Sequence, residues 1–539
     1  MFCYQCEETM NGEGCTNNGV CGKKGEVADL QDDLIYVLKS IAFYNQKARK
    51  AGISETSTDD FMLDALFSTV TNTDFRAAGI RDRIEKGFNI QKSIRQKLLD
   101  KKLIDENDQP GIATLTPENL RDRDTGVLAT ENVDIRSLRE LLIYGIKGIA
   151  AYAYHAGILG NGGKKINSFI EDGLVMTTDD SLDDQKLISA VLKCGEIGFD
   201  VMADLDMAHT SKFGNPSPVK VDIGTKANPA ILISGHDLYD LEQLLEQTLG
   251  TGVDVYTHGE MLPAHSYPKL SKYEHLAGNY GGSWWRQQQE FESFNGPILL
   301  TSNCIVPPKK TYIERLYTTG PVGYDGAIHI VAKDGKKDFS AIIEQAKTCK
   351  PPVQLEQGSI MTGFAYNSVL SNAERIVDAV KAGRIKKFIV MAGCDGRHKE
   401  RQYYTDFAAA LPKDTVILTA GCAKYRYNKL DLGEIDGIPR VMDAGQCNDS
   451  FSLIIIAQGL MSRLGFIDVN EAPISYNIAW YEQKAVLVLL TLLRLGIQDI
   501  TLGPRLPAFV SPNVLNVLVD KFNITANGSI EEDMERLVK

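Results

Sequence analysis

Three apolar runs in the last third of the chain each end in a glycine that is closely followed by a cysteine. They are FIVMAGC, VILTAGC and RVMDAGQC, which end at Cys394, Cys422 and Cys447. Each run is rich in large and β-branched residues and has the length of a buried strand. Open parallel sheets bind their ligands at the carboxyl ends of the strands. We therefore expect successive βαβ units to direct these three thiols toward one point.

Four further cysteines lie within the first 21 residues in a C-x2-C-x8-C-x5-C pattern, at Cys3, Cys6, Cys15 and Cys21. Four thiolates this close together suit a tetrahedral metal ion or an iron–sulfur cluster, and the interspersed glycines let the loop wrap closely around either. The pattern therefore predicts a metal site. An iron–sulfur cluster is the favoured interpretation, and a structural zinc ion is the alternative.

Three more residues with ligand-type side chains occupy the same position at the end of an apolar run. AILISGH ends at His236, VDVYTHGE at Glu260 and PILLTSNC at Cys304. Glu482 is a seventh candidate because it opens a very apolar helical run, and Lys484 follows two residues later. Each side chain alone has an ordinary explanation, as a core histidine, a small apolar cysteine, or an exposed or capping carboxylate. Their shared position favours one joint site, because sheet topology brings strand ends together.

This second set combines four thiols, one imidazole and two carboxylates. It is too large for one zinc ion, and soft and hard donors together indicate several iron atoms in mixed sulfur and oxygen surroundings. A sealed electron-transfer cluster needs only thiolates, whereas carboxylate ligands exchange more readily. We therefore expect a site at which a substrate binds iron, with the amino-terminal cluster passing electrons to it.

Composition limits the partners and the compartment. The 539 residues include 58 basic and 70 acidic side chains, a net charge of −12, which argues against a nucleic-acid or anionic-membrane surface. No secretory signal is visible, and the longest apolar stretch, near residues 485–493, is too short to span a bilayer. GILGNGGKK at Gly157 follows a helical run and has the wrong spacing for a phosphate-binding loop. We expect a cytoplasmic protein whose ten cysteines are ligands or catalysts rather than disulfides.

The hydrophobic pattern changes along the chain from helical to strand-like spacing. Residues 29–209 show helical spacing, with Ser or Asp before several runs as helix caps. From about residue 221, short apolar strands alternate with helices, as in parallel α/β domains. The predicted fold is multidomain α and α/β. An N-terminal helical-bundle domain (1–220) precedes two similar Rossmann-like parallel α/β domains (221–358 and 359–539).

Over its whole length the chain resembles the hybrid-cluster (prismane) proteins, a family of hydroxylamine reductases related to the nickel carbon monoxide dehydrogenases. The resemblance is carried by MFCYQCEET and GVCGKKGEVADLQDDLIY at the amino terminus, and by RSLRELLIYGIKGIAAYAYHA, GNYGGSWW, GCDGRH and LGPRLPAFVSPNV further on. It implies one helical domain and two similar α/β domains with a hybrid cluster where they meet. The spacing of the first four cysteines is similar to that of members with an amino-terminal [4Fe–4S] cluster.

The resemblance also implies a ligand set for a hybrid [4Fe–2O–2S] cluster. The seven ligands fall on His236, Glu260, Cys304, Cys394, Cys422, Cys447 and Glu482. Cys394 aligns with a cysteine that carries a persulfide in the oxidised state, and Lys484 aligns with a residue close to the cluster. All seven ligand types are present in this chain.

The implied function is reduction of hydroxylamine to ammonia and water, with Glu482, Lys484 and Cys394 as catalytic residues and a role in nitrosative stress. Electrons would come from a protein donor such as a ferredoxin, a rubredoxin or a separate reductase. We expect Glu482 and Lys484 to relay protons, because burial can shift their proton affinity toward the working pH. Two alternatives stay open: nitric oxide reduction or protein S-nitrosylation at the same cluster, and a non-catalytic electron carrier or redox sensor.

Five other cysteines and histidines receive no catalytic role. Cys194 lies in a helical pattern and is expected in the core, and Cys349 shortly precedes a Pro-Pro turn. The remaining three flank Glu260 and are expected to support a ligand or to be structural; they are His258, His265 and His275.

Overall fold

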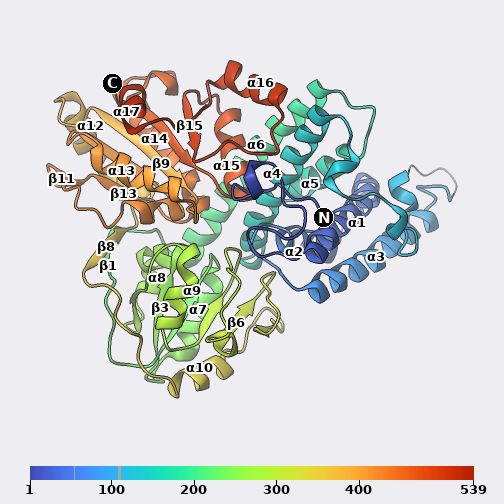
Figure 1. Ribbon diagram of the computed structural model, residues 1–539, viewed down its shortest axis with the longest axis horizontal. Helices are drawn as coiled ribbons and strands as arrows, with labels where there is room; N and C mark the ends of the chain where they lie inside the picture. Colours follow the sequence, from blue (N-terminus) through green and yellow to red (C-terminus); the bar gives the residue numbers. More distant parts are fainter. Residues whose placement is uncertain (54, 107–110, 539) are drawn as a thin grey trace.

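The computed structural model describes residues 1–53, 55–106 and 111–538, and its first part is helical. The helices are α1 (Gly25–Lys50), α2 (Thr56–Ser68), α3 (Ala77–Asp100), α4 (Val133–Ile158), α5 (Lys164–Met176) and α6 (Asp184–Phe213). They form the blue-to-cyan side of the molecule in Figure 1. Asn132 caps α4 and Asp183 caps α6 by accepting bonds from first-turn amides. The helical spacing of residues 29–209 is thus confirmed.

The next part is a six-stranded parallel sheet. Its strands are β2 (Ala230–Ser234), β3 (Asp254–His258), β4 (Leu276–Asn279), β5 (Ile298–Leu300), β6 (Leu316–Thr319) and β7 (Ile328–Ile330). Their order is β4-β3-β2-β5-β6-β7. The helices that accompany them are α7 (Leu238–Thr248), α8 (Pro268–Ser271), α9 (Gln287–Ser293) and α10 (Ser340–Lys347). Strands β2 and β3 are buried at every residue, which explains why their sequences read as continuous apolar runs.

The last part repeats this topology. Its strands are β9 (Lys387–Gly393), β10 (Thr415–Thr419), β13 (Val441–Asp443), β14 (Ile474–Ala479), β15 (Ile500–Gly503) and β16 (Thr525–Ala526), in the order β13-β10-β9-β14-β15-β16. Both sheets therefore have the Rossmann order 3-2-1-4-5-6. Strands one to three are added toward one edge of the sheet and strands four to six toward the other, so the topological switch point lies between the first and fourth strands. The accompanying helices are α11 (Tyr366–Ser371), α12 (Ala373–Lys381), α13 (Gln402–Ala410), α14 (Ser450–Leu464), α15 (Gln483–Arg494), α16 (Pro512–Phe522) and α17 (Ile530–Val538).

One detail differs from the expected series of βαβ units. Helix α13 connects β9 to β10, but the described residues 420–440, which lead from β10 to β13, contain no α-helix. They form a short 3-10 helix (Cys422–Arg426) and the hairpin of β11 (Glu434–Ile435) and β12 (Ile438–Pro439). The three glycine–cysteine strand ends are still neighbours, because β13, β10 and β9 are adjacent in the sheet.

Helix α15 lies at the centre of the molecule and packs against both α4 and α6 (Figure 1). Glycines make this close approach possible: a Cβ on Gly195 would lie 2.1 Å from the Leu490 carbonyl oxygen, and one on Gly148 would lie 2.8 Å from that of Gln483. Strands β1 (Val219–Asp222) and β8 (Ser359–Thr362) pair antiparallel and join the two α/β parts. No helix among the described residues is long and apolar enough to cross a membrane.

Candidate metal centre

All seven candidate ligands of the second set lie just beyond the carboxyl ends of parallel strands. They follow β2, β3, β5, β9, β10, β13 and β14, and are His236, Glu260, Cys304, Cys394, Cys422, Cys447 and Glu482. Glu482, which the sequence placed only at a helix start, is the N-cap of α15 and also follows β14. Both topological switch points therefore contribute to one site.

Three of these residues form the tightest group. One ligand atom each from His236, Glu260 and Cys447 lies within 4.8 Å of the other two. The Nδ1 atom of His236 is 2.6 Å from the Ser302 hydroxyl, which leaves Nε2 to face the Glu260 carboxylate at 3.7 Å. Burial, followed by the charge of Lys484, lowers the pKa of His236 well below its usual range, so the imidazole is neutral. A neutral imidazole oriented by its second nitrogen is the form that binds metals.

Only one of the two carboxylate oxygens of Glu260 has a hydrogen-bond partner. Oε2 accepts a hydrogen bond from the Cys447 backbone amide at 2.8 Å, whereas buried Oε1 has no hydrogen-bond partner. The Gln446 side-chain amide, on the turn that carries Cys447, donates to the carbonyl oxygens of His236 and Glu260 and holds the three segments together. A buried carboxylate oxygen without a partner is costly, and a metal ion would satisfy it.

The other three thiols gather around two aromatic side chains. Cys304, Cys394 and Cys422 pack with Trp284 and Tyr481 in one small cluster. Burial is the main cause that raises the pKa of all three thiols well above its usual range. Because these thiols would not ionise by themselves, ligation as thiolates requires the positive charge of a metal centre. Cys304 also has a φ of 83°, a strained value that non-glycine residues adopt mainly at functional sites.

Lys484 is at the centre of a polar network beside these ligands. Its Nζ lies 3.1 Å from His236 Nε2 and 3.6 Å from Glu482 Oε1, and donates to Asn303 Oδ1 at 2.7 Å. The Asn303 amide nitrogen in turn contacts Glu482 Oε1 at 3.3 Å and Cys304 Sγ at 3.5 Å. Burial opposes the charge of Lys484, but Cys447 and Glu482 outweigh it and raise the pKa of this lysine. The expected shift of the Lys484 pKa toward the working pH is therefore wrong: its charged neighbours favour the ammonium form.

The four amino-terminal thiols face a common small cavity in the loop of residues 1–24. They are Cys3, Cys6, Cys15 and Cys21. Backbone bonds pair Cys3 with Cys15, at 3.0 and 2.8 Å, and the Lys23 ammonium lies 3.6 Å from Cys3 Sγ. Within the described loop no three of these thiols lie within 4.8 Å of one another. Thiolates on one tetrahedral zinc lie only about 3.8 Å apart, since each Zn–S bond is about 2.3 Å. The wider spacing fits a multinuclear cluster better.

The amino-terminal loop is fastened directly to the segment that carries Glu482. The Glu7 amide donates to the Tyr481 carbonyl at 2.9 Å, and the Gln483 side chain donates to the Gln5 carbonyl at 2.6 Å. Two ion pairs, Arg401–Glu7 and Arg397–Glu8, tie the same loop to the second α/β part at 3.0 and 2.6 Å. The two cysteine sites are thus separated by one short layer of hydrogen-bonded backbone.

Comparison with known proteins identifies the family. The sequence model of the Prismane/CO dehydrogenase family matches residues 1–535. The chain belongs to this family. It is 63% identical over 539 residues to a hydroxylamine reductase of Methanosarcina mazei, covering all of both chains. It is also 56% identical over 550 residues to a hydroxylamine reductase of Natranaerobius thermophilus, covering 100% of this chain and 99% of the relative.

Solved structures support the fold of this Prismane/CO dehydrogenase family member. Carbon monoxide dehydrogenase IV of Carboxydothermus hydrogenoformans superimposes with a TM-score of 0.57 at 15% identity, over 99% of this chain and 92% of the other. A Ni-free carbon monoxide dehydrogenase of Thermococcus sp. AM4 gives the same score at 16% identity, over 100% and 89%. At this identity the similarity establishes the shared architecture alone.

Five further histidines and cysteines lie outside the set of seven candidate ligands in this family member. The three flanking histidines are bonded elsewhere: His258 to Ser234 and Glu290, His265 to Thr257, and His275 to Thr248. Cys194 is fully buried in the helical core, as expected, and Cys349 contacts the Gln345 carbonyl.

Sequence reasoning missed three residues of the centre: Asn303, Tyr481 and Tyr152, whose hydroxyl faces the Cys447 thiol. Asn303 directly precedes Cys304, and Tyr481 directly precedes Glu482, so adjacency to a strand-end ligand was the available signal. Tyr152 comes from α4 and had no such signal, because its approach depends on helix packing.

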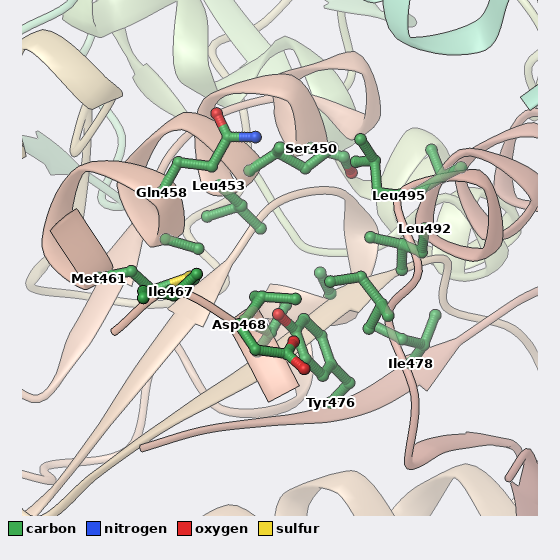
Figure 2. A pocket seen from close by; sticks show the side chains of 17 residues that line it. Ser450, Leu453, Gln458, Met461, Ile467, Asp468, Tyr476, Ile478, Leu492 and Leu495 are labelled. Atoms are coloured by element: carbon green, nitrogen blue, oxygen red, sulfur yellow. The ribbon is translucent and has the colours of Figure 1, made fainter. Parts of the chain in front are cut away.

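A separate apolar cavity of about 440 Å³ lies in the second α/β part (Figure 2). Val390 and Tyr476 of the sheet form one wall, and Leu453 of α14 and Leu492 of α15 form others. Its lining is mostly aliphatic, with Ser450, Gln458, Asp468 and Tyr476 as the polar members, and it contains none of the seven candidate ligands.

Proposed function

We propose that this protein reduces hydroxylamine to ammonia and water, consuming two electrons and two protons per turnover. The observation that carries the proposal is the convergence of an imidazole, two carboxylates and four thiols at the switch points of two sheets. Support also comes from full-length relatives at 56–63% identity that are named hydroxylamine reductases.

The cofactors are proposed from the donor sets. Cys3, Cys6, Cys15 and Cys21 would hold a [4Fe–4S] cluster. A hybrid [4Fe–2O–2S] cluster would be held by His236, Glu260, Cys304, Cys394, Cys422, Cys447 and Glu482, with a persulfide at Cys394. When bound, the hybrid cluster would supply electrons and an iron atom that polarises the N–O bond as a Lewis acid.

The protein side chains would manage protons and position. Lys484, held by Asn303 and Glu482, presents an ammonium beside the Nε2 of His236 and can donate a proton to the leaving hydroxide. Glu482 Oε2 accepts a hydrogen bond from the Lys484 backbone amide at 2.8 Å, whereas Oε1 has the longer contacts, with the Asn303 amide at 3.3 Å and Lys484 Nζ at 3.6 Å, and would be the oxygen that exchanges them for a ligand or a proton. Cys394 would supply the persulfide sulfur on the side of the hybrid cluster where hydroxylamine binds.

Electrons are proposed to arrive through the amino-terminal cluster. Its loop is exposed at Met10 and Val20 and contacts the Tyr481–Glu482 segment on its inner side. The donor would be a protein such as a ferredoxin, a rubredoxin or a reductase. We also propose the division into domains 1–220, 221–358 and 359–539, whose first boundary lies within β1 and whose second lies directly before β8. We further propose a cytoplasmic location.

The test uses anaerobically purified protein. We expect about eight irons per chain, two EPR-distinct cluster types, and turnover of hydroxylamine with a reduced dye. Glu482→Gln should lower turnover while the protein folds and keeps its amino-terminal cluster. Unchanged turnover in that variant would refute the role of Glu482. About four irons of one type would refute the two-cluster assignment. Faster turnover of nitric oxide than of hydroxylamine would favour the alternative substrate, and no turnover of either would favour an electron carrier.

A further inference from the structure

Five charged side chains meet in a small recess behind the amino-terminal cysteines. The recess has a volume of about 40 Å³ and is lined by Cys3 on one side and by residues of α1 and α4 on the others. Its charged members are Lys23, Asp32, Lys39, Glu140 and Lys147. The volume suffices for water, which needs about 10–15 Å³ by this kind of measure. Nothing in the proposed reaction uses this group.

The lysines nearest to the cysteines are anchored. Lys23 Nζ donates to Gln31 Oε1 at 2.7 Å and contacts Cys3 Sγ at 3.6 Å. Lys147 Nζ donates to Gln5 Oε1 at 3.0 Å and so reaches the segment between Cys3 and Cys6. These contacts place positive charge beside the cysteine loop and connect it to the recess.

The two carboxylates face each other across the recess from different helices. Asp32 of α1 faces Lys23 of the loop, Glu140 and Lys147 of α4, and Asp29 of its own helix, and burial raises its pKa to about 7. The charged and titratable groups around Glu140 are Lys39 of α1 and Lys147, Tyr144 and Arg136 of α4, and burial again raises the pKa. Both residues keep part of their surface accessible, although their carboxyl groups are buried. The pair is therefore buried enough to disfavour two negative charges and open enough to exchange protons.

We propose that Asp32 and Glu140 form a proton-loading pair for the amino-terminal cluster. When one electron from the protein donor is taken up there, one proton from solvent binds to the pair. When the electron passes on, that proton returns to solvent through the recess. This inference rests on the proposed function in one respect, the presence of a [4Fe–4S] cluster on the four amino-terminal cysteines.

The physical reason is charge compensation in a poorly solvated place. An added electron makes the neighbourhood of Cys3 more negative, which makes protonation of a nearby carboxylate more favourable. The coupling is reciprocal, so a bound proton favours reduction by the same free energy. The reduction potential should therefore fall as pH rises. The limit is about 59 mV for each tenfold drop in proton concentration, the one-electron equivalent of a factor of ten.

The experiment is an EPR-monitored redox titration of the amino-terminal cluster in the holoenzyme at several pH values. We expect the wild-type potential to fall with pH and the Asp32→Asn/Glu140→Gln variant to show little or no dependence. Asp33→Asn is the matched control, because Asp33 is the next carboxylate on α1 but does not itself line the recess, and it accepts a hydrogen bond from Thr125; it should keep the wild-type slope. Asp32→Glu in the Glu140→Gln background should restore the slope.

A second measurement covers the case in which the double variant does not fold. Reduction of the wild-type protein in weakly buffered solution with an indicator dye should consume about one proton per electron at the amino-terminal cluster. A pH-independent wild-type potential, no proton uptake, or an unchanged slope in the double variant would overturn the inference. Those results leave the proposed function intact. Absence of any [4Fe–4S] signal would instead refute the cofactor assignment of the proposed function.

Discussion

Asn303 holds the only side-chain amide that contacts both Lys484 and Glu482 among the described residues. It is 1% exposed, so bulk solvent does not reach these contacts in the folded protein. Asn303→Ala should leave the Lys484 ammonium without its closest acceptor and lower the turnover of hydroxylamine by about 10–100-fold, the usual effect of losing a partner that orients a metal site. Turnover with a reduced dye, together with iron content, checks this.

The matched control for that prediction is Asn448→Ala. Asn448 is equally buried and directly follows Cys447, but its amide contacts Asp449 instead of Lys484. We expect this variant to keep most of its turnover. Equal losses in the two variants would mean that packing around the cysteines, and not the position of Lys484, determines the rate.

His209 of α6 makes part of the stability depend on pH. It is 2% exposed, its Nδ1 has no partner, and burial lowers its pKa to about 3. Below the unfolded value of about 6.5 the unfolded chain binds a proton that the folded chain does not, so stability is complete above this pH and is lost as pH falls. Below pH 6.5 the free energy of unfolding of His209→Phe should therefore fall less steeply than that of the wild type, by up to about 1.4 kcal/mol per pH unit. Thermal unfolding midpoints of both proteins at several pH values below 6.5 measure it; parallel curves would contradict it.

At the scale of elements, α15 positions Glu482 and Lys484, and the glycines of α4 and α6 position α15. A Cβ on Gly195 would lie 2.1 Å from a backbone oxygen of α15, so Gly195→Ala must displace one helix. We expect a loss of stability of about 1–3 kcal/mol and a reduced turnover, because Glu482 moves with its helix. Thermal unfolding and the dye assay measure these effects.

Gly157→Ala is the contrasting substitution on α4. No atom lies within 4 Å of the Cβ that it would add. Because alanine is the better helix former, this variant should be unchanged or slightly more stable. A loss of stability in Gly157→Ala as large as that in Gly195→Ala would contradict the assignment of the Gly195 effect to close helix packing.

The elements were predictable where a local pattern reported them. Apolar runs that stop at Gly, as before Cys394 and Cys422, reveal both the strand and its direction, and parallel pairing then brings their ends together. The connection from β10 to β13 was mispredicted because a hairpin and a 3-10 helix can span the distance that an α-helix usually spans. Tyr152 was missed because its place depends on α4 packing near Cys447, a contact between residues almost 300 positions apart in the sequence.

At the scale of the whole molecule, the arrangement separates electron uptake from chemistry. The first sheet contributes His236, Glu260 and Cys304, the second contributes the other four candidate ligands, and α4 covers the centre. The amino-terminal loop contacts the Tyr481–Gln483 segment, so any electron that arrives there is one hydrogen-bonded layer from the centre. Neither α/β part alone could form the site.

This arrangement predicts different consequences for the two cysteine sets. Cys15→Ser should remove the amino-terminal cluster, because it replaces one of the four thiols around the common cavity with a hydroxyl, which is a much poorer ligand for iron–sulfur clusters. The seven strand-end ligands come from other elements, so about four irons should remain at the centre. Turnover with a protein donor should fall by more than about 100-fold, since that donor cannot reach buried ligands, whereas a small reduced dye should retain a measurable part of the rate. Cys349→Ser, a cysteine outside both sets, is the control and should leave both rates unchanged. If Cys15→Ser retained full turnover with the protein donor, electrons would have to enter at the centre directly, and the amino-terminal loop would have only a structural role.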